Sequence, residues 1–96
     1  MAKVPKFLQP YLASYDLSQL DIQKDKRLII TEVLNKGDGE ALEWLTENYK
    51  DGDIRNAVSN PIRGFWMKSV LSYWLKILGI KLHPKTLRQA ILNLNP

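Results

Sequence analysis

Turn-forming residues divide this chain into segments of roughly ten to fifteen residues, and this division limits the folds open to it. Glycine and proline, often beside Asp or Asn, occur around positions 37–39, 51–53, 60–64, 79 and 84. Between them, apolar residues recur at spacings of three and four, and no segment alternates apolar and polar residues between hairpin turns. The sequence therefore predicts an all-α fold, a single compact domain over residues 1–96 with about five helices around one core.

Capping residues and apolar spacing locate the expected helices. Asp21, Asp38 and Asp53 are each suited to cap the start of a helix, and Gly37 is suited to end one in the left-handed conformation. Two prolines within residues 1–14 prevent a long helix there, so this segment is expected to be an N-terminal arm. The expected helices cover residues 22–36, 40–49, 53–59, 65–78 and 84–94.

The segment 65–78 is the most apolar part of the chain. Lys68, Ser72 and Lys76 recur every four residues, which leaves a narrow polar strip on an otherwise apolar helix. We therefore expect this helix to be the central one. The residues expected to supply much of the core from it are Phe65, Trp66, Val70, Leu71, Trp74, Ile77 and Leu78.

The chain carries no pattern typical of an enzyme. It has no cysteine, no glycine-rich phosphate loop and no nucleophile motif, and its single histidine, His83, precedes a proline where a helix cap is the better interpretation. Glu43 and Glu47 are expected on a solvent-facing side of their helix rather than in a cleft. We expect a non-enzymatic protein with no catalytic residue, metal site or cofactor. Without a secretory signal or a membrane-length apolar run, a soluble, cytoplasmic protein is expected.

Charge is distributed very unevenly along the sequence. Residues 1–53 carry seven Lys and Arg against ten Asp and Glu, whereas residues 54–96 carry seven Lys and Arg and no acidic residue. A half with charge of one sign attracts polyanions or the acidic face of a protein. This asymmetry indicates a binding function, and three interpretations of it remain open.

The first interpretation is a nucleic-acid surface. The expected helices 40–49 and 53–59 have the lengths of a helix-turn-helix, with Arg55 and Asn56 on the second helix as candidate base-reading side chains. The other Lys and Arg side chains of this half would then contact phosphates or the acidic partner. The full set of candidate nucleic-acid or partner-binding residues is Arg55, Asn56, Arg63, Lys68, Lys76, Lys85 and Arg88.

The second interpretation is a surface for another protein. The C-terminal helix over 84–94 has a basic shoulder of Lys85 and Arg88 beside an apolar stripe of Leu87, Ala90, Ile91 and Leu94. Such a helix can dock into an acidic, apolar groove or pair with a second copy as a homodimer. In the third interpretation the acidic and basic halves neutralise each other, and the chain is a structural or adaptor domain that binds no nucleic acid.

Several segments resemble a group of small bacterial proteins, many uncharacterised, that are encoded beside nucleotidyltransferase-like toxins. The resemblance covers roughly residues 5–80 and rests on Tyr15–Asp21, Leu34–Asp38, Ala41–Leu45, Asp53–Arg55, Arg63 and Phe65–Trp66. It implies an antitoxin-like or accessory role, in which the protein binds the neighbouring toxin and, in some cases, DNA. The leading hypothesis is therefore a binding protein whose basic C-terminal half engages an acidic partner, either a toxin protein or DNA or RNA.

Overall fold

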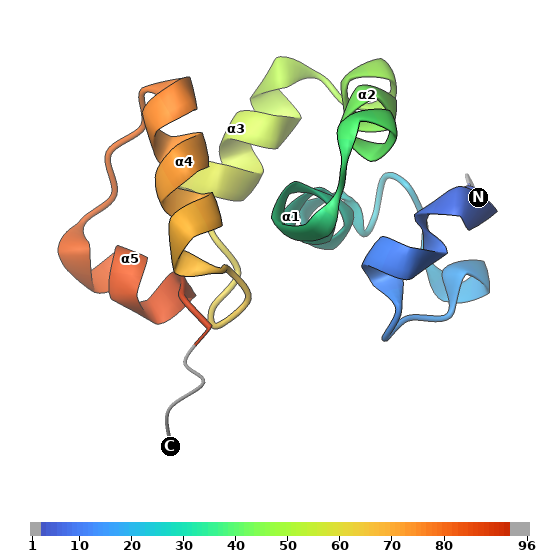
Figure 1. Ribbon diagram of the computed structural model, residues 1–96, viewed down its shortest axis with the longest axis horizontal. Helices are drawn as coiled ribbons and strands as arrows, with labels where there is room; N and C mark the ends of the chain where they lie inside the picture. Colours follow the sequence, from blue (N-terminus) through green and yellow to red (C-terminus); the bar gives the residue numbers. More distant parts are fainter. Residues whose placement is uncertain (1–2, 93–96) are drawn as a thin grey trace.

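Helix α1 (Lys26–Lys36) lies at the centre of the molecule, with the other elements around it (Figure 1). The computed structural model describes residues 3–92. Within this range the elements in chain order are the 3-10 helices η1 (Lys6–Leu12) and η2 (Leu17–Gln19), then α1, α2 (Gly39–Asn48), α3 (Asp51–Ser59), α4 (Lys68–Leu78) and α5 (Pro84–Ala90). The described residues form no β-strand, only two isolated bridges. The prediction of an all-α domain with about five helices is confirmed.

The central position of α1 follows from its burial on all sides. Every residue from Ile29 to Asn35 is buried, including the polar Thr31 and Glu32. The helix contacts η1 on one side, α3 and α4 on the other, and α2 as well. A helix covered around its circumference is expected only in the middle of a fold.

The expectation that the helix within 65–78 would be central is wrong. Helix α4 begins only at Lys68, and Leu71 is its one fully covered side chain. Tyr73 and Ile77 are 57% and 58% exposed, respectively. The apolar surface of α4 exceeds what its neighbours cover, because α4 lies at one side of the molecule against α3 (Figure 1).

The start of α1 also differs from the prediction. Residues 22–25 form a turn, and the carboxylate of Asp21 accepts the backbone N–H groups of Gln23 and Lys24 at 3.0 and 2.8 Å. The carboxylate of Asp25 in turn accepts the N–H of Asp21 at 2.9 Å, so the side chains at the two ends of this turn bond to its backbone. Asp21 therefore caps a turn, and α1 follows one turn later.

Two further boundary predictions need correction. Gly37 is extended rather than left-handed, and a Cβ atom there would lie 2.5 Å from the carbonyl oxygen of Val33 and 3.1 Å from the Cβ of Ala41, so lack of space requires the glycine. Helix α3 begins at Asp51 rather than Asp53, and Asp53 accepts the backbone N–H of Lys50 from the third helical position.

Residues 64–67 pair with the C-terminal segment instead of extending α4. The N–H groups of Gly64 and Trp66 donate to the carbonyls of Gln89 and Ala90 at 2.8 and 2.9 Å, and the N–H of Leu92 donates to the carbonyl of Trp66 at 2.7 Å. Helix α5 accordingly ends at Ala90, not near residue 94. Residues 93 and 94 of that predicted helix lie outside the described residues.

The N-terminal arm contains the short 3-10 helix η1, which packs on α1. Leu8 and Leu12 of η1 are fully buried, whereas Phe7 of the same helix is 39% exposed. The three tryptophans contribute to the core unequally, because Trp66 is fully buried whereas Trp44 and Trp74 are only partly covered. The arm therefore places Phe7 at the surface beside α2.

Candidate functional site

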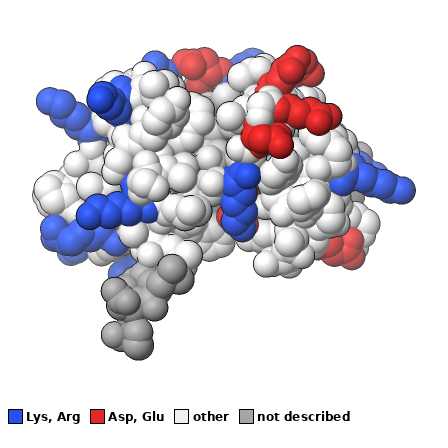
Figure 2. All heavy atoms as spheres, in the orientation of Figure 1, with Lys and Arg blue, Asp and Glu red and all other residues white. Residues whose placement is uncertain are grey.

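The uneven charge of the sequence appears as two separate regions of the folded protein. In Figure 2, Lys and Arg side chains gather at the left, on the side where Figure 1 shows α4 and α5, and acidic side chains gather at the upper right near α2. The candidate residues Arg63, Lys68, Lys76, Lys85 and Arg88 are all exposed. The basic half of the sequence thus remains a basic region of the surface.

Ion pairs neutralise little of this basic region. Among the described residues, the ion pairs are Lys26–Asp53 at 2.8 Å, Lys36–Glu32 at 3.2 Å and Arg55–Asp51 at 2.8 Å. Arg55 is the only base beyond residue 53 that takes part in them. The mutual neutralisation of the two halves, as in the third interpretation of the sequence, is therefore limited to Arg55 within residues 3–92.

The two candidate base-reading residues, Arg55 and Asn56, are exposed but make hydrogen bonds to other groups of the same chain. The Nε atom of Arg55 donates to Asp51 at 2.8 Å, and its Nη1 atom donates to the carbonyl of Leu78 at 3.0 Å, at the carboxyl end of α4. Asn56 accepts the side-chain N–H of Asn60 at 2.8 Å. Two consecutive helices, α2 and α3, are present as predicted. However, the Arg55 and Asn56 side chains bond to groups of α3, of the adjoining Asn60 and of α4.

Two other predicted residues come together at a groove between α4 and α5. Lys68 at the start of α4 and Arg88 on α5 line it with three apolar side chains, Leu87, Ile91 and Leu92, around a volume of about 380 Å³. Leu92 is 46% exposed, and so is Met67 beside Lys68. The name basic groove is used below for its five lining residues, Lys68, Leu87, Arg88, Ile91 and Leu92.

The remaining predicted residues lie elsewhere on the basic region. Lys76 lines a different hollow with Lys81 at the carboxyl end of α4. Arg63 is exposed in the loop before α4, and the neighbouring Trp66 is fully buried, so its ring offers no exposed face for stacking. Lys85 is exposed on the first turn of α5, where the His83 ring accepts its backbone N–H at 3.1 Å. His83 thus caps α5, as the sequence indicated.

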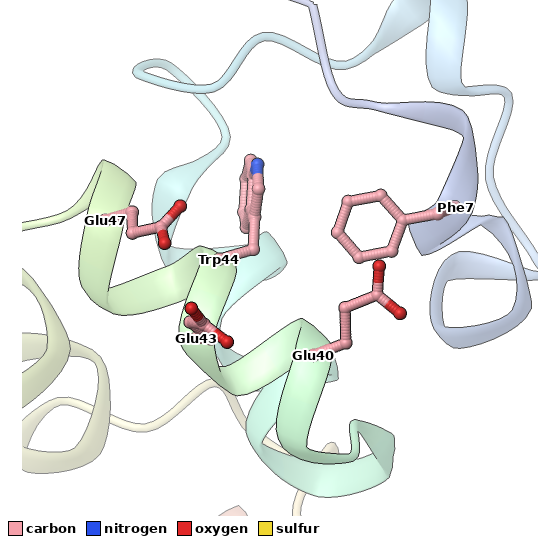
Figure 3. Close-up of a pocket in the computed structure, with 5 residues that line it drawn as sticks. All are labelled: Phe7, Glu40, Glu43, Trp44 and Glu47. Carbon is pink, nitrogen blue, oxygen red and sulfur yellow. The ribbon is translucent and has the colours of Figure 1, made fainter.

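A second pocket, which sequence reasoning missed, lies between the arm and α2 (Figure 3). It is lined by the aromatic rings of Phe7 and Trp44 and by the carboxylates of Glu40, Glu43 and Glu47, around a volume of about 330 Å³. In Figure 3 the Phe7 and Trp44 rings approach the same space from the arm and from α2, with the carboxylate of Glu40 beside Phe7. We call these five residues the acidic pocket.

The acidic pocket was missed because half of it comes from the arm. The spacing of Glu40, Glu43 and Glu47 indicated a solvent-facing side of a helix, which is correct for α2 alone. No sequence signal placed Phe7, more than 30 residues earlier, against that side. Trp44 is held on the pocket wall by an edge-to-face contact with Tyr49, with ring centroids 5.8 Å apart.

Comparison with known proteins assigns the chain to a family. A model described as a family of unknown function, DUF6922, matches residues 9–58, which include α1, α2 and most of α3. The chain belongs to the DUF6922 family. Comparisons with curated proteins and with solved structures gave no significant match. The DUF6922 segment contains the four α2 residues of the acidic pocket, whereas every residue of the basic groove lies beyond it.

Between residues 3 and 92 no helix has both the length and the apolar character that crossing a membrane requires. In the same range no group of three or more His, Asp or Glu side chains is arranged to hold a metal ion.

Proposed function

We propose that this protein is a non-enzymatic binding protein whose basic C-terminal half engages an acidic partner. The observation that supports this most directly is the basic groove, where Lys68 and Arg88 flank apolar side chains. Neither base has an ion-pair partner among the described residues. Charged groups beside apolar surface suit a partner that carries both carboxylates and apolar side chains.

The composition of the groove favours a protein partner over nucleic acid. Phosphate binding requires cations and polar groups, whereas Leu87, Ile91 and Leu92 supply apolar surface that a phosphate backbone does not use. In addition, Arg55 and Asn56 already make hydrogen bonds within the protein. An amphipathic segment with acidic residues beside its apolar face is the class of partner that fits best.

An antitoxin-like role is one specific form of this proposal. There the acidic partner is a toxin encoded nearby, as the resemblance of Tyr15–Asp21, Ala41–Leu45 and Phe65–Trp66 to proteins with such neighbours implies. Engagement through the basic groove would cover the exposed Leu92 and Met67 at the same time. Burial of such apolar surface supplies affinity, while the two bases supply orientation.

A binding titration with defined probes tests the proposal. The probes are a fluorescent amphipathic peptide with Leu at helical spacing and Glu elsewhere, the same peptide with Lys for Glu, and duplex and single-stranded DNA and RNA. We expect the Glu peptide to bind, with binding weakened by salt, and the Lys peptide not to bind. Lys68→Glu/Arg88→Glu should lose at least tenfold in affinity, whereas Lys3→Glu/Lys24→Glu, with the same change in net charge, should lose much less.

Each alternative result has a distinct meaning. Failure of the Glu peptide and of all nucleic acids to bind would overturn the proposal. Binding of DNA or RNA alone would assign the basic region to nucleic acid and overturn the choice of a protein partner. Equal losses in the two double variants would show that net charge, not the groove, determines binding.

A further inference from the structure

The basic groove and the acidic pocket are chemically complementary regions of one molecule. The groove presents Lys68 and Arg88 beside Leu87, Ile91 and Leu92, and the pocket presents three carboxylates beside two aromatic rings. The pocket lies between the arm and α2, and the groove lies between α4 and α5, at opposite sides of α1 in Figure 1. One molecule therefore cannot bring its own two regions into contact.

Both regions hold charges that the described part of the chain does not pair. Glu40, Glu43 and Glu47 form no ion pair within residues 3–92, and neither do Lys68 and Arg88. Both also leave apolar surface uncovered, because Phe7 of the pocket is 39% exposed and Leu92 of the groove is 46% exposed. The pocket thus has carboxylates that the cations of the groove could pair with, and each region has apolar side chains that the other could cover.

We infer that the acidic pocket of one copy docks onto the basic groove of a second copy. Lys68 and Arg88 would pair with carboxylates of the pocket, and the guanidinium of Arg88 is suited to lie over the face of Trp44. The aliphatic parts of these long side chains would cover the Phe7 ring. The inference shares the groove with the proposed function but does not require a foreign partner.

Docking of this kind is head to tail, because different surfaces of the two copies meet. Each added copy leaves one free pocket and one free groove. Because these regions lie at opposite sides of α1, two copies cannot join through both contacts at once, so the assembly grows beyond a dimer as concentration rises, unless a larger ring closes. A foreign acidic partner would compete for the groove and shorten the assembly. This differs from a closed homodimer in which two C-terminal helices meet.

A complementation experiment tests this directly. The acid-reversed variant is Glu43→Lys/Glu47→Lys, and the base-reversed variant is Lys68→Glu/Arg88→Glu; all four side chains are exposed, so we expect the helical circular dichroism to be unchanged. Each variant keeps one intact docking region. Sedimentation should show that each alone stays at the monomer mass of 11.1 kDa, while an equimolar mixture associates, because the intact groove of one variant meets the intact pocket of the other.

The wild-type protein supplies the second readout. At about 0.05 M salt its average mass should rise with protein concentration beyond that of a dimer, and at about 0.5 M salt it should return to the monomer mass. Lys3→Glu/Lys24→Glu controls for net charge and should associate as the wild type does. A mixture of the two reversed variants that stays monomeric would overturn the inference, and so would a wild-type mass that stops at a dimer.

Failure of this inference and failure of the proposed function are distinguishable. The acid-reversed variant keeps the basic groove, so it should bind the Glu peptide with affinity within about threefold of the wild type while no longer self-associating. Peptide binding without self-association in the wild type would reject only the head-to-tail docking. Self-association without peptide binding would reject only the foreign acidic partner.

Discussion

The side-chain amide of Asn35 holds the backbone on both sides of Trp66. Its Nδ2 atom donates to the carbonyl of Phe65 at 3.2 Å, and its Oδ1 atom accepts the N–H of Met67 at 3.1 Å. Asn35 is 8% exposed on the central helix, and Trp66 is completely buried. One amide from α1 thus fixes the extended segment that carries the largest core side chain.

Replacing Asn35 by Ala should destabilise the protein by about 2–4 kcal/mol, because the Phe65 carbonyl and the Met67 N–H would both lose their buried partner. Urea denaturation measures the change in the free energy of unfolding. Asn48→Ala is the matched control, since Asn48 is exposed and donates only to the carbonyl of Trp44 in its own helix. Equal losses in the two variants would show that the Asn35 amide does not hold this segment.

Tyr49 should make stability depend on pH in the alkaline range. Its buried hydroxyl donates to the carbonyl of Ile22 at 2.9 Å. Burial, followed by the nearby charge of Asp53, raises the pKa of Tyr49 well above its usual value. The phenol ionises more readily in the unfolded chain, so the contribution is complete below pH 10 and is lost as the pH rises towards the folded-state pKa.

Comparison of wild type with Tyr49→Phe measures this effect. At pH 7 the variant should be less stable by about 1 kcal/mol, the contribution of one hydrogen bond. Between about pH 10 and pH 11 the wild type should lose more stability than the variant, so the difference between them should shrink. Tyr73→Phe, at a ring that is 57% exposed, should show neither change.

Asp53 should make the stability of the fold depend on pH in the acidic range. The hydrogen bond from Lys26 at 2.8 Å, together with the bond from the Lys50 backbone N–H, lowers the pKa of Asp53. A lowered folded-state pKa stabilises the fold above the unfolded-state value of about 4 and loses this effect as the pH falls through the folded-state pKa. Asp53→Asn should therefore unfold at lower urea concentration than wild type at pH 6, and the difference between the two should shrink as the pH falls below about 4. A constant difference across that range would contradict the assignment.

Two glycines should respond oppositely to replacement by alanine. Gly79 ends α4 with a φ angle of +67°, where an L side chain is strained, so Gly79→Ala should cost about 1 kcal/mol. Gly52 lies within α3 with open space around its Cβ position, so Gly52→Ala should gain about 0.4–1 kcal/mol from the reduced entropy of the unfolded chain. Thermal unfolding of the two variants should move in opposite directions.

Local patterns in the sequence were sufficient to predict the fold class and the order of the helices. Apolar spacing located segments within each of α1 to α5, and Gly79 and Pro84 marked a helix end and a helix start. These features depend on residues within one or two turns of each other. The same kind of pattern placed the start of the fourth helix at residue 65, whereas α4 begins at Lys68. Residues 65–67 are extended because the side chain of Asn35, 30 residues before Phe65, bonds to their backbone.

The candidate site was predictable only in part for the same reason. Charge counts identified the basic half, including Lys68 and Arg88, but the groove forms where α4 meets the end of α5. The acidic pocket depends on the arm, which brings Phe7 to α2. The roles of Arg55 and Asn56 within the fold depend on α4 and Asn60, which composition does not reveal.

The pairing of Gly64 and Trp66 with Gln89, Ala90 and Leu92 closes a loop that contains both α4 and α5. Closing a loop of this length costs conformational entropy, and the three backbone hydrogen bonds repay that cost only when all form together. The two helices should consequently open and close as one cooperative unit while α1, α2 and the arm stay folded. In hydrogen exchange, the amide protons of Gly64, Trp66 and Leu92 would then share one opening rate, and the basic groove would exist only in the closed state.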